Sequence, residues 1–140
     1  MDDILLNKAA IIERCLSRIG EEYQEHETEL ETNHTKQDSI ILNLLRACEA
    51  SIDAAMHIVR IKKLGVPQQS RDAFRLLNEN GLLDNQLCSR MQAMVGFRNI
   101  AVHNYQKISL AILRSILENH LSDFQEFVSR LLRFDHAADH

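Results

Sequence analysis

Apolar residues recur at helical spacing along most of this chain, and very little interrupts them. The 140 residues include only four glycines and one proline, which favours long helices joined by few turns. Hydrophobic residues make up 45% of the chain, and a chain of this length buries about two-thirds of its unfolded surface as one domain. The sequence therefore predicts an all-α, single-domain helical bundle of about five helices.

The apolar stripes and the capping residues place these five helices. Gly65 and Pro67 are expected to stop the second of them, because glycine suits a C-cap and proline cannot continue a helix. The helical domain is expected to span residues 1–134, and the polar segment 135–140 is interpreted as a disordered tail. In chain order, the expected helices cover approximately residues 3–31, 35–64, 70–80, 84–98 and 109–133.

Cofactor and membrane signals are absent from the sequence. The three cysteines, Cys15, Cys48 and Cys88, are far apart and each lies among apolar residues, so they are interpreted as buried, reduced thiols. No Cys-x2-Cys, His-Glu-x-x-His or glycine-rich phosphate loop occurs, and neither a metal ion nor a nucleotide cofactor is expected. With no run of 18 apolar residues and no basic, apolar start, the protein is expected in the cytoplasm.

The stretch that points most directly to chemistry runs from Arg98 to Tyr105 and contains His103. It lies within residues 85–117, which contain no Asp or Glu, although the whole chain has a net charge of −4. Such a stretch predicts a local positive field that can hold a phosphate. The overall charge counts against broad nucleic-acid binding and fits a narrow basic cleft. Four basic residues fall inside the acid-free stretch: Arg90, Arg98, Lys107 and Arg114.

The spacing of the motif constrains how it can work. On a regular helix, Arg98 and His103 would point about 140° apart, so they meet only if the helix ends or bends, or if the cleft lies between two helices. Ile100 and Val102 are β-branched, and Asn104 tolerates a left-handed cap. We therefore expect Arg98 on the last turn of a helix, with the residues from His103 onwards at its frayed end or in the following loop.

The pattern Arg98-Asn99-x-x-x-His103-x-Tyr105 is similar to the Arg-x4-His-x-Tyr motif of the HepT-like toxins, which are small all-helical ribonucleases of the HEPN superfamily. The resemblance extends over most of the chain, roughly residues 3–132. Three further segments resemble family landmarks in family order: Gly65-Val66-Pro67, Arg71-Asp72-Ala73-Phe74 and Met94-Val95-Gly96-Phe97-Arg98-Asn99.

This resemblance implies a metal-independent endoribonuclease that is the toxin of a type VII-like toxin–antitoxin module and cleaves RNA such as tRNA or mRNA. His103 can act as base or acid, Arg98 can stabilise the phosphate charge, and Asn99 can orient either side chain. A two-fold homodimer would supply the second histidine that separate acid and base roles need. The resemblance also makes Tyr105 the acceptor of AMP groups from a cognate MntA-type minimal nucleotidyltransferase antitoxin.

Other interpretations of the same residues remain open. Arg98 could pair with an acid and His103 could cap a helix, which would leave a non-catalytic docking subunit of a nucleotidyltransferase. Tyr105 could stack on an RNA base or simply pack. The acidic half of the first expected helix is either a solvated face or a docking strip for a partner. The intact Arg98 and His103 pair favours the ribonuclease.

Overall fold

The computed structural model describes residues 2–138, and all regular structure within them is helical. The all-α prediction is therefore confirmed for this part of the chain, with six α-helices instead of about five. No helix among these residues is long and apolar enough to cross a membrane. The elements are α1 (Asp3–Tyr23), the 3₁₀ turn η1 (Glu27–Glu29), α2 (His34–Ile61), α3 (Ser70–Glu79), α4 (Asn85–His103), the 3₁₀ turn η2 (Tyr105–Lys107), α5 (Leu110–Asn119) and α6 (Leu121–Ala138).

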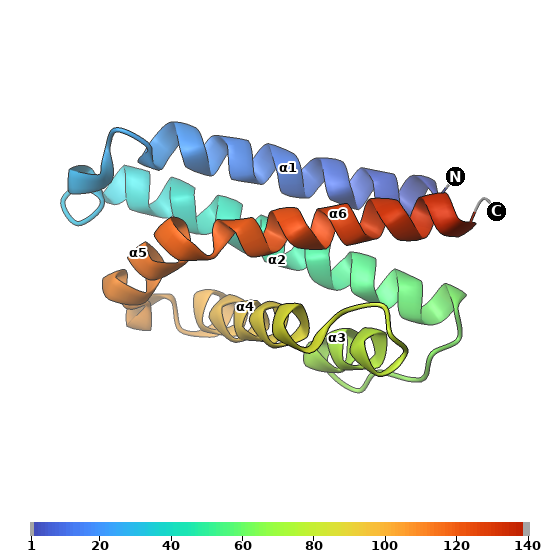
Figure 1. Cartoon of the computed structure of the whole chain (residues 1–140). Helices are drawn as coiled ribbons and strands as arrows, with labels where there is room; N and C mark the ends of the chain where they lie inside the picture. Colours follow the sequence, from blue (N-terminus) through green and yellow to red (C-terminus); the bar gives the residue numbers. More distant parts are fainter. Residues whose placement is uncertain (1, 139–140) are drawn as a thin grey trace.

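Three long helices, α1, α2 and α6, lie side by side, and α3 and α4 pack beneath them (Figure 1). The rings of Phe74 on α3 and Phe127 on α6 meet edge-on with centroids 5.6 Å apart, so the two layers share one core. As predicted, the three cysteines are buried and form no disulfide. The largest fully buried side chains are Ile12, Ile19, Leu30, Ile40, Leu44, Ile58, Phe74, Leu77, Leu87, Met91, Phe124 and Phe127.

The first helix is shorter than the sequence pattern predicts, because α1 ends at Tyr23 and not near Glu31. Its end carries Glu21 and Glu22 and no basic residue in the last turn, and negative charge at a helix C-terminus opposes the helix dipole. The chain then turns through Glu25, whose φ of 65° is left-handed. Leu30 is nevertheless fully buried, so the stripe includes a core residue that lies beyond the end of the helix.

The predicted last helix is two helices, because the chain breaks between α5 and α6 at His120. The backbone there leaves the helical conformation, with φ −126° and ψ 0°. Asp123 fixes the break: its backbone N–H donates to the His120 carbonyl at 3.1 Å, and its buried carboxylate lies 3.1 Å from His120 Nδ1. Helix α6 continues to Ala138, so residues 135–138 are helical and not the disordered tail predicted for 135–140. Residues 139 and 140 lie outside the described residues.

Candidate active site

Helix α4 carries the motif and is unbroken as far as His103. The Asn104 N–H still donates to the Ile100 carbonyl at 2.8 Å, so the expected ending before His103 is wrong. Arg98 lies more than one turn before the end of the helix. The β-branched residues did not stop α4, because their cost is small beside the burial of its packed face. On this regular helix, Arg98 and His103 point about 140° apart, and one chain does not bring them to a single phosphate.

Arg98 is half-buried and contacts three neighbours. Its Nε lies 2.8 Å from Glu49 Oε1 on α2, an ion pair in which the N–H is not aligned for a hydrogen bond. One terminal nitrogen donates to Asn99 Oδ1 at 2.8 Å, and the other donates to Ser70 Oγ at 3.4 Å. Because a guanidinium has five N–H donors, donors remain for phosphate oxygens, while Glu49 offsets part of the charge.

Ser70 can contact Arg98 because it is the first residue of α3 and does not cap the helix. Serine at the start of a helix is often the N-cap, but the cap of α3 is Gln69, and Ser70 is the first helical residue. Asp72 accepts from the backbone N–H groups of Gln68 at 2.9 Å and Gln69 at 3.2 Å, and these bonds hold its pKa below the usual value. The Ser70 hydroxyl is therefore not needed for capping and can accept from Arg98.

His103 is exposed at the C-terminal end of α4. Its imidazole makes no hydrogen bond or ion pair with any residue that the structure describes. An accessible imidazole can take a proton from a bound ligand or give one to it. Asn99 is exposed and contacts Arg98, so the supporting role predicted for it has geometric support on the arginine side. No three His, Cys, Asp or Glu side chains in the described part of the chain gather as a metal site.

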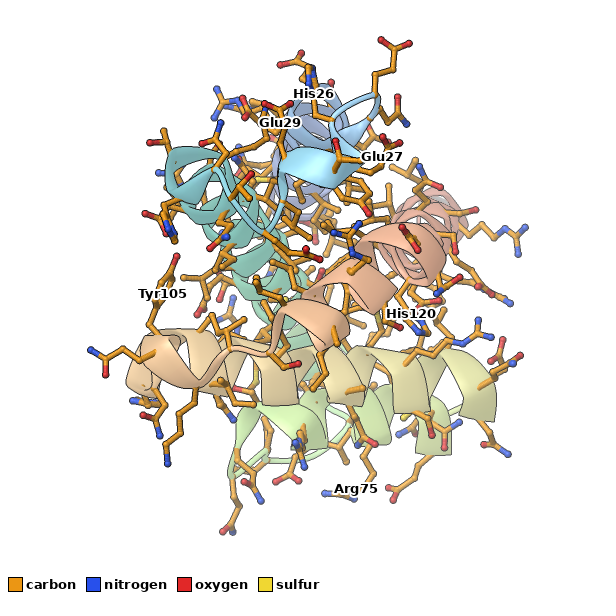
Figure 2. The ribbon with its side chains drawn as sticks, turned by 90° about the vertical axis from the view of Figure 1, so that its left-hand side faces the viewer. His26, Glu27, Glu29, Arg75, Tyr105 and His120 are labelled. Carbon is orange, nitrogen blue, oxygen red and sulfur yellow. The ribbon has the colours of Figure 1, made fainter. Side chains whose placement is uncertain are left out.

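Tyr105 lies in η2, directly after α4, and its side chain rises toward α2 (Figure 2). Its hydroxyl donates a hydrogen bond to Asp38 Oδ1. Partial burial, together with the Asp38 carboxylate, raises the pKa of Tyr105 to about 12. The residue remains 44% exposed. It borders a hollow of about 320 Å³ between α2 and the end of α4, lined by Asp38, Ile41, Leu42, Leu45, Ala101 and Tyr105.

The local positive field predicted for the acid-free stretch is largely offset in the fold. Lys107 is exposed and forms no ion pair with a described residue, but the arginines of the stretch are not free. The sequence could not show this, because the acids come from distant segments or lie just beyond the end of the stretch. The pairs that reach across the fold are Arg90–Asp123 at 3.3 Å, Arg98–Glu49 at 2.8 Å and Arg114–Glu31 at 3.0 Å.

Arg71 is a cation beside the motif that the sequence interpretation gave no role. A Cβ placed on Gly96 would lie 2.9 Å from Arg71 Nη2, so the guanidinium rests on α4 where this glycine leaves room. Arg71 belongs to α3, so Gly96 marks a close contact between α4 and a side chain of the neighbouring helix. His103 follows Gly96 by seven residues and therefore shares its face of α4. The mid-helix glycine was the available signal for Arg71.

Comparison with known proteins places the chain among ribonucleases. The family model described as "Ribonuclease HepT-like" matches residues 12–131. The mRNA nuclease HepT of Shewanella oneidensis is 48% identical over 128 residues, which are 91% of this chain and 96% of that protein.

Solved structures give the same result for the fold. The tri-AMPylated Shewanella oneidensis HEPN toxin in complex with MNT antitoxin superimposes with a TM-score of 0.90 at 46% identity, covering 95% of this chain and 99% of that chain. A toxin–antitoxin structure with AMP-PNP superimposes with a TM-score of 0.91 at 45% identity, covering 94% and 99%. Both likenesses span nearly the whole helical bundle.

Proposed function

The chain belongs to the ribonuclease HepT-like family, and on that premise we propose that it is the toxin of a toxin–antitoxin pair and cleaves RNA through Arg98 and His103. The observation that carries the proposal is the His103 imidazole, which is exposed and without a partner among the described residues. A histidine kept only for structure would cap or pair, as His57 does between Asp2 and Arg60.

The proposed reaction uses groups that this chain supplies. The ribose 2′-OH attacks the neighbouring phosphorus, a base takes its proton, and an acid protonates the 5′-oxygen that leaves. His103 serves in proton transfer, which contributes about 10²- to 10⁴-fold to a rate. Arg98 offers its remaining N–H donors to the phosphate oxygens as negative charge develops on them. The need for a 2′-OH makes RNA the substrate, and the name of the Shewanella relative suggests mRNA. The expected location of this activity is the cytoplasm.

We further propose that the complete site forms in a two-fold homodimer, with Arg98 of one copy facing His103 of the other. The divergence of the two side chains on α4 supports this arrangement, because a single chain leaves the site incomplete. An apolar hollow of about 390 Å³ between α4 and α5 adjoins the motif. Ile100 and Ile112 border it and are 42% and 56% exposed, which suits an interface between copies.

Control of the toxin is proposed to act through Tyr105, with AMP added by a minimal nucleotidyltransferase antitoxin of the MNT or MntA type. The Shewanella toxin in the matched complex is tri-AMPylated. On this chain, Tyr105 is an exposed hydroxyl two residues after His103. Each AMP adds a negative phosphate and a base beside the catalytic groups, which competes with RNA for Arg98 and obstructs the cleft.

The activity is tested with purified protein and RNA in EDTA, followed by analysis of the product ends. Cleavage that leaves a 2′,3′-cyclic phosphate or its hydrolysis product is expected, and His103→Ala should lower the rate by at least about 10²-fold with an unchanged helical spectrum. An inactive wild-type protein that still binds the antitoxin would support the docking-subunit alternative. Cleavage that stops in EDTA would contradict the metal-independent mechanism.

The shared site is tested by mixing inactive variants. Arg98→Ala and His103→Ala homodimers should each be inactive, but dissociating and reassociating them together should restore part of the activity, because the mixed dimer holds one intact Arg98 and His103 pair. Light scattering should show a dimer, and Ile112→Asp should convert it to an inactive monomer. Absence of activity in mixed dimers that demonstrably form would contradict the arrangement.

A further inference from the structure

Tyr105 and Asp38 meet across 67 positions of sequence. Asp38 lies on the second turn of α2 and is exposed, and Tyr105 approaches it from η2 (Figure 2). The carboxylate accepts the phenol hydrogen bond and forms no ion pair with any described residue. Two nearby carboxylates are paired with cations: Glu49 and Asp123 each contact an arginine of α4. Asp38 therefore presents an unneutralised negative charge to one hydroxyl.

The phenol that Asp38 contacts is hard to ionise by itself. Its pKa is raised to about 12, first by burial and then by the Asp38 carboxylate, so phenolate is scarce at neutral pH. Adenylylation nevertheless requires the phenol oxygen to act as a nucleophile toward phosphorus. A hydroxyl in this situation reacts fastest when a base accepts its proton during the attack, as the catalytic-loop aspartate of protein kinases does for the hydroxyl of their substrates.

We propose that Asp38 is the general base for addition of the first AMP to Tyr105, so that the toxin itself supplies a catalytic residue for its own inactivation. This inference rests on the proposed function, in which Tyr105 is the acceptor. In the step, Tyr105 Oη bonds to the α-phosphorus of ATP while the bond from that phosphorus to the β-phosphate bridging oxygen breaks. Pyrophosphate leaves with the bonding electrons, and the phenol proton passes to Asp38 Oδ1.

The surroundings of Tyr105 suit such a step. The side chain is 44% exposed, so a nucleotide held by the antitoxin can reach the oxygen while the phenol still donates its hydrogen bond to Asp38. The hollow beside Tyr105 is lined by Ile41, Leu42, Leu45 and Ala101 in addition to the two reacting residues. Its apolar walls bring no competing donor to the carboxylate. Once the ester has formed, Oη has no proton to donate, and the hydrogen bond to Asp38 is lost.

The test is the initial rate of labelled AMP transfer from ATP to the toxin by its cognate antitoxin. Asp38→Asn keeps the shape and a hydrogen-bond acceptor but cannot take the proton, and we expect the maximal rate to fall about 10²-fold, with little change in the concentration of toxin needed for half-maximal rate. Asp53→Asn is the matched control: it lies on the same helix, is 55% exposed at its side chain and pairs with Lys8 at 3.2 Å. Its rate should equal that of the wild type.

The outcomes separate this inference from the proposed function. Transfer to Asp38→Asn at the wild-type rate would overturn the inference while leaving Tyr105 as the acceptor. A loss that appears only as weaker binding to the antitoxin would assign Asp38 to docking and would also overturn it. A wild-type toxin that cleaves RNA but gains no AMP at Tyr105 would refute the acceptor assignment itself. Circular dichroism of both variants establishes that any loss is not unfolding.

Discussion

The chain has two tyrosines, and both donate their phenol hydrogen to a carboxylate from a distant segment. Tyr23 donates to Glu118 at 2.8 Å and also accepts from Arg114 at 3.0 Å. Tyr105 donates to Asp38 alone. Tyr23 is 6% exposed, whereas Tyr105 is 44% exposed. The same phenol–carboxylate contact therefore occurs once inside a closed network and once at an open surface.

The two pairs also differ in whether a cation contacts the carboxylate. Arg114 also contacts Glu31 at 3.0 Å, so it joins the end of α1, the segment after η1 and α5, and it neutralises the acid that Tyr23 meets. We call this group of four residues the Tyr23 clamp. In the Tyr105–Asp38 pair no cation offsets the carboxylate among the described residues. The clamp therefore joins distant segments of the fold, whereas the open pair is the one to which we assign the adenylylation step.

The largest effect expected from this comparison concerns adenylylation. Tyr105→Phe should abolish AMP transfer and leave the toxin active in the presence of the antitoxin, because the acceptor oxygen is gone. Tyr23→Phe should be modified at the wild-type rate, since the buried Tyr23 oxygen is inaccessible. Intact-mass and peptide mass spectrometry after co-expression measure both. AMP found on Tyr105→Phe at wild-type levels would contradict the assignment of Tyr105 as the acceptor.

RNA cleavage should distinguish the corresponding arginines. Arg98→Ala should lower the cleavage rate by about 10²-fold or more, because phosphate stabilisation of this kind is worth that much. Arg114→Ala should leave the rate within about threefold of the wild type and act on stability instead, because Arg114 belongs to the clamp. Initial rates on a labelled RNA, read beside thermal unfolding of each variant, decide this. Equal losses of cleavage would place Arg114 in the RNA site.

The fold was largely predictable from the sequence, but element ends were not. The apolar stripe of the first predicted helix includes Leu30, which is buried although it lies beyond the end of α1, because a stripe reports which side chains are apolar and not where the backbone turns. Asp123 shows the limit most clearly. Aspartate is rarely fully buried, but Asp123 is 1% exposed and contacts Arg90 and His120. The contact with His120, three residues away, accompanies the break in the predicted last helix, whereas the contact with Arg90 depends on how α4 packs against α6.

Phenol titration should sharpen the comparison next. In Tyr23→Phe, only Tyr105 titrates, and its absorbance change should centre near pH 12, where the fold raises its pKa. Adding Asp38→Asn should lower this value toward that of a free tyrosine. Because the folded pKa is raised, the stabilisation from the neutral phenol is complete below about pH 10 and is lost as the pH rises toward 12. A midpoint near 10 in the single variant would show that the Asp38 contact is absent in solution.

The two Tyr→Phe variants should rank in the opposite order for stability: Tyr23→Phe should lower the free energy of unfolding more than Tyr105→Phe. Tyr23→Phe leaves Glu118 and Arg114 with a missing partner at a part-buried site, and such losses cost about 1–3 kcal/mol. Tyr105→Phe removes one exposed hydrogen bond and leaves the Asp38 carboxylate exposed to water. We therefore expect the free energy of unfolding to change by no more than about 0.5 kcal/mol. Urea unfolding followed by circular dichroism measures both. A larger loss for Tyr105→Phe than for Tyr23→Phe would contradict the assignment of the clamp.

The candidate site was only partly predictable for a similar reason. The motif shows that Arg98, His103 and Tyr105 are close in sequence, but the partners of Arg98 (Glu49 and Ser70) and of Tyr105 (Asp38) come from α2 and α3. Helix packing decides which acids lie beside an arginine, and these acids decide how much of its positive charge is available to a ligand. The acid-free stretch therefore overstated the positive field.

The smallest expected effect is on the unfolding free energy of two Gly→Ala variants, which tests whether the Arg71 side chain is held in place as firmly as that of Arg114. Alanine is favoured over glycine inside a helix by about 1 kcal/mol. Gly20→Ala in α1 is the control, because its new Cβ would meet nothing within 4 Å, and it should gain most of that value. Gly96→Ala places a Cβ 2.9 Å from Arg71 Nη2, the far end of a flexible side chain that forms no ion pair in the described structure, so the guanidinium should move aside. We expect a smaller net gain in unfolding free energy than for Gly20→Ala, measured by urea denaturation of both. A net loss of about 1 kcal/mol or more in unfolding free energy would mean that the Arg71 guanidinium cannot move aside. Arg71 would then be held in place on α4 as Arg114 is held in the Tyr23 clamp.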